Sequence, residues 1–273
     1  MPKIAANGIV FYYEIHGSGP ALVLLEGLGY ASWMWNRQVE ELAKHFTVVI
    51  FDNRGVGYSD KPEMEYSIKL FAEDTAEVMR ALHIEKAHIL GVSMGGFIAQ
   101  EFAILYPEMV DGLILCSTSF GGPNSVPIPQ ETLDIMMQGG SKDGSIEKAR
   151  YAVSTALNLE TIAEHPDIID FIIEQQRENP QPKHAYQRQL YAGASFNSEA
   201  RVHTIWAKTL ILAGRGDRVV PCENARLLHE KIPNSKEIII EGTGHLFLME
   251  KPDVTNRLII NFLTQSEVKE GIL

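Results

Sequence analysis

The segment from Ala87 to Ala103 limits the fold more than any other part of this sequence. The apolar run from Ala87 to Leu90 leads into the motif GVSMG at residues 91–95, and helix-forming residues continue to Ala103, before Tyr106 and Pro107. A strand, a sharp turn and a helix in this order are typical of a nucleophile elbow, where G-x-S-x-G exposes a serine hydroxyl on a strained turn. Glycine is favoured on both sides of the serine because larger side chains would collide with the crowded backbone. The segment therefore predicts a strand and a helix joined at Ser93.

Strands and helices are expected to alternate along much of the remaining chain. After a hairpin over residues 3–16, apolar runs of strand length occur at 21–25, 47–51, 110–116, 209–213 and 237–240. Helical patterns occur at about 32–44, 67–82, after Pro221, and at 252–264. This alternation predicts an α/β fold with a mostly parallel central sheet flanked by helices.

The strand pattern stops between residue 121 and about residue 203. Helical patterns take its place near 131–138, 145–157, 167–178 and 183–195, separated by prolines. We therefore expect a core made of residues 1–121 and 204–273. Residues 122–203 are expected to form a helical cap, inserted above the sheet.

Composition and charge exclude several kinds of partner. The formal net charge of −11 argues against nucleic acid, because phosphate binding requires a basic surface. No apolar segment approaches membrane-spanning length and the N-terminus lacks a long apolar region, so we expect a cytoplasmic protein with no membrane partner. The two cysteines, Cys116 and Cys222, form no C-x-x-C pair, and Cys116 is expected to be buried.

Two polar residues follow later strands at positions where chemistry is expected. Asp217 lies just after the run at 209–213, and His245 lies in a glycine-flanked loop after the strand at 237–240. By itself, Asp217 is typical of a helix cap and His245 of a surface loop. However, the order Ser, Asp, His, each just past the carboxyl end of a strand, is the arrangement expected for a catalytic triad on such a sheet. We therefore predict a triad of Ser93, Asp217 and His245.

The combined motifs resemble those of the α/β-hydrolase superfamily over about residues 21–262. The elbow, a GLG motif at 27–29, the segment 52–60 and the loops of Asp217 and His245 occur in the order typical of that superfamily. The resemblance implies that Ser93 is the nucleophile, that His245 is the general base and acid, and that Asp217 orients His245.

The resemblance also implies an oxyanion hole and no cofactor. The backbone N–H groups of Leu28 and Met94 would be its donors. We expect neither a metal nor an organic cofactor, since no metal-ligand spacing or phosphate-binding loop occurs in the sequence.

Two acidic residues near these motifs require interpretation. Glu26 stands where members of the superfamily commonly carry histidine. The favoured interpretation is a loop support that hydrogen-bonds neighbouring backbone. The alternative hypothesis places its negative charge near the oxyanion site, which would disfavour anionic substrates unless burial kept the carboxyl neutral. Asp52 is expected to have a structural role, holding loops together.

The nucleophile narrows the expected reaction. A serine suits an acyl-enzyme and acyl transfer to water, whereas an aspartate would suit dehalogenases or epoxide hydrolases. The motif set is most similar to small serine esterases and enol-lactonases, which implies hydrolysis of a small carboxylic ester or lactone. Alternatives on the same fold are a carbon–carbon bond hydrolase and a cofactor-free perhydrolase. A ligand-binding, receptor-like protein with little turnover is a further alternative, although its hallmark would be a missing triad member.

Several apolar residues are candidates for the substrate pocket, but we interpret them as core because apolar residues at helical spacing are common. They are Trp33, Trp35, Met136, Met137, Phe171 and Tyr191.

Overall fold

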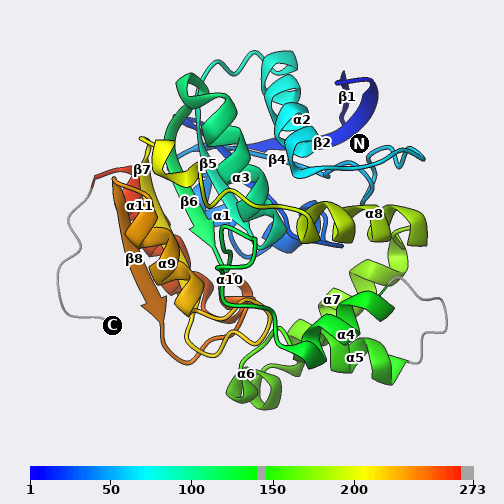
Figure 1. The fold of residues 1–273 in the computed structure, drawn as a ribbon. Helices are drawn as coiled ribbons and strands as arrows, with labels where there is room; N and C mark the ends of the chain where they lie inside the picture. Colours follow the sequence, from blue (N-terminus) through cyan, green and yellow to red (C-terminus); the bar gives the residue numbers. More distant parts are fainter. Residues whose placement is uncertain (140–145, 266–273) are drawn as a thin grey trace.

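A computed structural model describes residues 1–139 and 146–265, and within them the chain forms one eight-stranded sheet (Figure 1). The strands lie in the order β1-β2-β4-β3-β5-β6-β7-β8. Their bounds are β1 Lys3–Ala6, β2 Ile9–His16, β3 Ala21–Leu25, β4 Thr47–Phe51, β5 Ala87–Val92, β6 Val110–Cys116, β7 Lys208–Gly214 and β8 Ser235–Ile240. The first two strands pair antiparallel, β2 also pairs antiparallel with β4, and all pairs from β4 to β8 are parallel. The predicted α/β fold with a mostly parallel sheet is confirmed.

Side chains of the central strands alternate between two apolar layers, as the period of two residues in a strand requires. In β3, Val23 and Leu25 pack into one cluster, while Leu22 and Leu24 pack into the other, and all four are fully buried. This arrangement explains why the strand is a continuous apolar run. Cys116 at the end of β6 is also fully buried, as expected.

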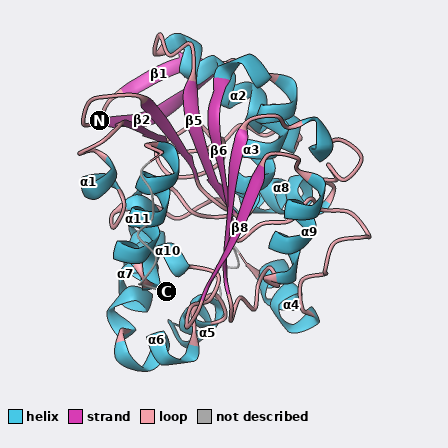
Figure 2. Cartoon of the chain, turned by 90° about the vertical axis from the view of Figure 1, so that its left-hand side faces the viewer, coloured by secondary structure: helices cyan, strands magenta, loops and turns pink. Residues whose placement is uncertain are grey.

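Helices cover both faces of the sheet (Figure 2). Residues of α2 (Ile68–Ala81), α3 (Met94–Leu105) and α9 (Glu223–Lys231) belong to the first cluster, and residues of α1 (Val39–Leu42), α10 (Phe247–Glu250) and α11 (Pro252–Leu263) belong to the second. The Ser67 side chain accepts a hydrogen bond from the Leu70 N–H and so caps α2, which begins at the next residue.

The continuous helix predicted at about 32–44 is wrong. The chain instead forms a 3₁₀ helix, η1 (Ser32–Trp35), and the four-residue α1. The bend between them lets Trp35 lie fully buried in the core and lets the buried Gln38 amide donate to the Leu248 carbonyl, N–O distance 2.7 Å. These tertiary contacts outweigh the local helical pattern.

In the described residues, five α-helices lie between β6 and β7 in the sequence, and all but the last of them lie below the carboxyl ends of the strands in the view of Figure 1. They are α4 Gln130–Gln138, α5 Ile146–Ser154, α6 Leu159–Glu164, α7 Pro166–Glu178 and α8 Lys183–Ala194. Four match the predicted helical segments, although α5 ends at residue 154 rather than 157 and position 145 lies outside the described residues. The short α6 was not predicted. In the described part of the chain, no helix combines the length and apolar character needed to cross a bilayer.

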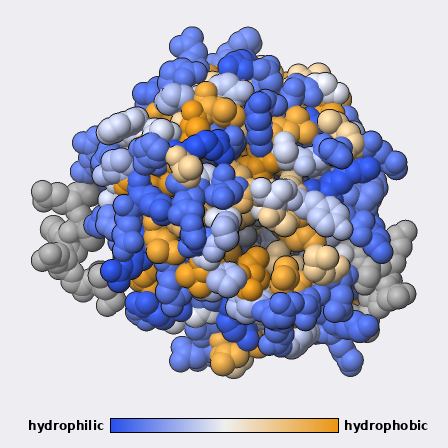
Figure 3. Space-filling model, in the orientation of Figure 1, coloured by the Kyte–Doolittle hydropathy of each residue, from blue (hydrophilic) through white to orange (hydrophobic). Residues whose placement is uncertain are grey.

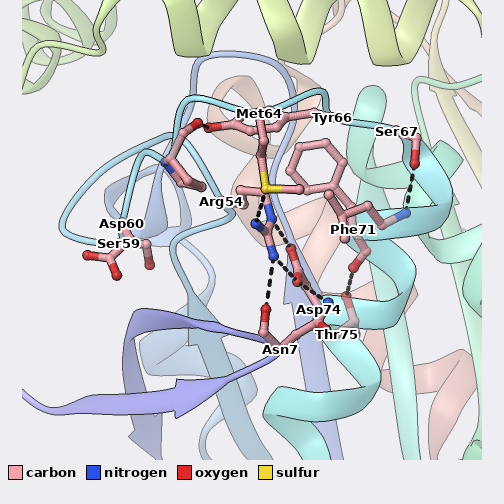
Figure 4. A network of polar contacts seen from close by, with 12 residues as sticks. Asn7, Arg54, Ser59, Asp60, Met64, Tyr66, Ser67, Phe71, Asp74 and Thr75 are labelled. Carbon is pink, nitrogen blue, oxygen red and sulfur yellow. Dashed lines mark hydrogen bonds and ion pairs between the residues drawn. The ribbon is translucent and has the colours of Figure 1, made fainter.

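A buried ion pair joins the N-terminal hairpin, the loop after β4 and α2 (Figure 4). Arg54 donates to both carboxylate oxygens of Asp74, from Nε at 2.8 Å and from Nη2 at 2.7 Å. The Asn7 side-chain amide also donates to Asp74, at 2.7 Å. Both charged side chains are at most 2% exposed. This network fixes the base of the loop that follows β4.

Candidate active site

Ser93 lies at a strained turn between β5 and α3, as the sequence predicts. Its φ of 56° and ψ of −118° are unfavourable for a residue with a side chain. The turn is held by its backbone: the Ser93 N–H donates to the Cys116 carbonyl at 2.9 Å, and the Ser93 carbonyl accepts from the Gly96 N–H at 2.9 Å. A Cβ at Gly95 would overlap the Leu25 carbonyl oxygen, so the close approach of β3 requires glycine there.

The loop after β3 passes directly beside the serine. A Cβ at Gly27 would lie 3.2 Å from the Ser93 Cβ. Leu28 follows in the same loop, and Met94 begins α3. Within residues 1–139 and 146–265, neither the Leu28 nor the Met94 backbone N–H donates a hydrogen bond. These two groups are therefore available as donors, although their role as an oxyanion hole remains a prediction.

Asp217 and His245 are brought together from the loops after β7 and β8. His245 Nδ1 lies 2.8 Å from Asp217 Oδ2, and both residues are buried. The second carboxylate oxygen accepts from the Val219 and Val220 N–H groups, each at 2.8 Å. Asp217 therefore bonds to loop backbone as well as to His245, whereas α9 begins only at Glu223. These bonds hold the carboxylate in one orientation toward the imidazole.

Two residues after β6 connect the serine turn with the histidine loop. The Ser117 hydroxyl donates to the His245 carbonyl, and the Thr118 hydroxyl donates to the Ser93 carbonyl, both at 2.9 Å. In the part of the chain that the structure describes, Ser93 Oγ and the His245 ring form no hydrogen bond with each other. Catalytic hydrogen bonds are often long without substrate and tighten when it binds. Ser117 and Thr118 were not predicted from the sequence, although they are polar residues directly after a buried strand.

Glu26 supports neighbouring backbone, as the favoured interpretation predicted. It is fully buried, and its Oε1 accepts from the Asn53 N–H at 2.5 Å. Burial, and then the negative charge of Asp52, raise the pKa of Glu26 well above its ordinary range.

Asp52 holds two loops together, which confirms its expected structural role. Its Oδ1 accepts from the Ser32 N–H at 2.7 Å, and its Oδ2 accepts from the Tyr58 N–H at 2.6 Å. A Cβ at Gly57 would overlap this carboxylate, which explains a glycine within the segment 52–60.

A glutamine of α8 bonds to the loop after β3. The fully buried Gln189 accepts from the Gly29 N–H at 3.2 Å and donates to the Arg54 carbonyl at 2.9 Å. The Gln181 amide also donates to Gln189, at 3.0 Å. This contact was not predicted from the sequence, because no sequence pattern marks a single glutamine on a helix.

Aromatic side chains also join the core to the helices between β6 and β7. The Trp33 ring centroid lies 5.1 Å from that of Tyr30 and 6.0 Å from that of Phe171. The interpretation of the pocket candidates as core is wrong for two of them, since Met137 is 55% and Tyr191 59% exposed. Figure 3 shows a hollow near the centre of this face, bordered by hydrophobic residues, between the regions over α3 and over α4 and α7.

Over the described ranges 1–139 and 146–265, no three His, Cys, Asp or Glu side chains lie together in a way that could hold a metal ion.

A sequence model of the alpha/beta hydrolase fold family matches residues 20–252, which is most of this chain. The protein therefore belongs to the α/β-hydrolase family.

Several relatives carry more specific names. The chain is 30% identical over 244 residues to a poly(3-hydroxyalkanoate) depolymerase of Ectopseudomonas oleovorans, covering 89% of this chain and 84% of that one. The structure of Est816, described as an N-acyl homoserine lactone degrading enzyme, matches with a TM-score of 0.84 at 28% identity and covers 96% of this chain and 100% of Est816. The meta-cleavage product hydrolase CumD from Pseudomonas fluorescens IP01 matches with a TM-score of 0.85 at 27% identity, covering 98% of each chain. These names support a hydrolase, but they refer to different substrates.

Proposed function

We propose that the protein is a serine hydrolase that cleaves a small carboxylic ester or lactone through an acyl-enzyme intermediate. The triad is Ser93, His245 and Asp217. The single observation that carries this proposal is the buried hydrogen bond between His245 Nδ1 and Asp217 Oδ2, in a protein whose serine elbow ends β5 of the same parallel sheet. A carboxylate on Nδ1 fixes the imidazole tautomer that leaves Nε2 free to accept a proton.

The proposed reaction follows from these positions. Ser93 Oγ attacks the substrate carbonyl carbon as His245 accepts the hydroxyl proton, and the carbonyl oxygen becomes an oxyanion. The Leu28 and Met94 N–H groups stabilise that oxyanion. His245 then gives its proton to the leaving alkoxide, which departs as the alcohol. Water, deprotonated by His245, attacks the acyl-enzyme and releases the acid and free Ser93.

The region that covers the carboxyl ends of the strands is proposed to determine which substrate binds. We propose that residues 122–203 act as the cap and that 1–121 and 204–273 form the catalytic core. The hydrophobic border of the hollow in Figure 3 supports an apolar acyl or alcohol group. The similarity to CumD favours a second candidate, hydrolysis of a carbon–carbon bond at the same serine.

A substrate panel tests the proposal. Purified protein is assayed with p-nitrophenyl esters of increasing acyl length, with simple γ- and δ-lactones, and with a meta-cleavage dienoate. We expect turnover of the esters or lactones, with a maximum at a short acyl length, because the proposed substrate is small. Turnover of the dienoate alone would contradict the ester and lactone proposal and support the carbon–carbon hydrolase.

A further inference from the structure

The carboxyl group of Glu26 is fully buried, and only one of its two oxygens accepts a hydrogen bond. Its Oε1 accepts from the Asn53 N–H, whereas its Oε2 is among the buried atoms with no hydrogen-bond partner in the described residues. The side-chain oxygen Oδ1 of the adjacent Asn53 is also buried and unpartnered. An ionised carboxylate is an acceptor only, so a buried oxygen without a donor is costly for the charged form. A protonated carboxyl would convert Oε2 into a donor.

Asp52 is the charged neighbour, and its environment is different. Each of its two oxygens accepts a backbone N–H, from Ser32 and from Tyr58. Burial raises the pKa of Asp52, but these hydrogen bonds and the charge of Lys61 lower it. Two buried carboxyl groups that repel each other do not both ionise readily. The negative charge of the pair therefore belongs on Asp52, and the proton on Glu26.

The charged side chains of the same loop and of the candidate site have other partners. Arg54, which follows in the same loop, forms an ion pair with Asp74. In the site itself, Asp217 is bonded to His245. In the described residues, neither Arg54 nor His245 forms a hydrogen bond or ion pair with Glu26 that would favour its charged form.

The position of Glu26 links it to the reacting centre. It lies two residues before Leu28, and a Cβ at Gly95 would lie 2.7 Å from the Glu26 carbonyl oxygen. A shift of Glu26 would therefore move both the loop after β3 and the start of α3, which carry the two proposed oxyanion donors.

We propose that Glu26 is a positioning residue that acts as a neutral carboxylic acid, aligning the Leu28 loop without placing negative charge beside the developing oxyanion. This inference rests on the proposed function. A carboxylate at this position would oppose the oxyanion, whereas the neutral acid keeps the hydrogen bond from Asn53 and adds no charge.

Stability against pH tests the protonation state without any assay of activity. The folded state binds one more proton at Glu26 than the unfolded state between the unfolded pKa, about 4.3, and the folded value. The contribution of Glu26 to stability then falls as the pH rises through this range. Compared with Glu26→Gln, the unfolding equilibrium constant of the wild type should increase by up to about tenfold per pH unit. If the difference in the free energy of unfolding between the two proteins stays constant with pH, the proposal that Glu26 is a neutral acid is wrong.

Kinetics test the positioning role. Glu26→Ala should lower kcat for a substrate ester by on the order of tenfold, because a misplacement of catalytic groups by about 1 Å can cost up to about 10²-fold in rate. If Glu26 ionises at alkaline pH, the kcat of the wild type should decline there, whereas Glu26→Gln should restore kcat at neutral pH and lack this decline. An alanine variant with the wild-type kcat, or a glutamine variant with the same alkaline decline, would overturn the inference.

The two proposals fail in different ways. If Ser93→Ala keeps its activity, the proposed function is wrong, while the stability comparison still reports on Glu26. If Ser93→Ala is inactive and the stability difference is constant with pH, only the inference about Glu26 is wrong.

Discussion

Replacing Ser93 with alanine is expected to lower kcat/KM for ester hydrolysis by at least about 10⁴-fold, because removal of the nucleophile leaves only the contributions of binding and oxyanion stabilisation. The fold should survive, since the hydrogen bonds that hold the turn involve the backbone of Ser93. The measurement is steady-state hydrolysis of the preferred ester, together with thermal unfolding of both proteins.

Ser235→Ala is the matched control for loss of a serine hydroxyl. Ser235 begins β8, so it lies at the opposite edge of the sheet, and its hydroxyl donates to the Ile232 carbonyl. This variant should hydrolyse the ester at the wild-type rate. A Ser93→Ala protein whose turnover stays within tenfold of the wild type would contradict the assignment of the nucleophile.

The second large effect is expected from Asp74→Ala, which should destabilise the protein by about 3–5 kcal/mol. The substitution leaves the Arg54 guanidinium buried without its bidentate partner (Figure 4). It also removes the acceptor of the Asn7 amide. Urea unfolding, with the slope checked for change, gives the difference in the free energy of unfolding.

An exposed pair on the same helix provides the control. Lys69 and Glu73 form an i,i+4 ion pair at 3.7 Å on the surface of α2, so Glu73→Ala should cost no more than about 1 kcal/mol. The double variant Arg54→Met/Asp74→Leu should regain much of the lost stability, because it removes both buried charges. Equal changes in the free energy of unfolding for Asp74→Ala and Glu73→Ala would show that the buried ion pair contributes no more to stability than the exposed one.

The parallel sheet was predictable because its strands are buried on both faces. Leu22 to Leu25 are buried in two layers, so every position of this strand requires an apolar residue. A segment at the surface has no such requirement. The bend after Trp35 was not predictable in the same way. It depends on the contact of Gln38 with Leu248, which lies 210 residues away in the sequence.

The candidate site also contains residues that were predictable from the sequence and residues that were not. Ser93, Asp217 and His245 could be found because each follows a strand, and parallel strands bring their carboxyl ends to one edge. The contacts that support them come from side chains without a sequence pattern, such as Gln189 on the Gly29 N–H. The protonation of Glu26 depends on burial and on one missing donor, which only three-dimensional packing determines.

Covalent labelling tests the acyl-enzyme mechanism most directly. The protein is treated with diethyl p-nitrophenyl phosphate, which phosphorylates an activated serine and releases p-nitrophenol, and the modified residue is located by peptide mass spectrometry. We expect loss of activity in proportion to a single diethyl phosphate on Ser93, and no label in the Ser93→Ala protein. An active enzyme that takes up no label at Ser93, or that is inactivated by a label on another residue, would contradict the proposed mechanism.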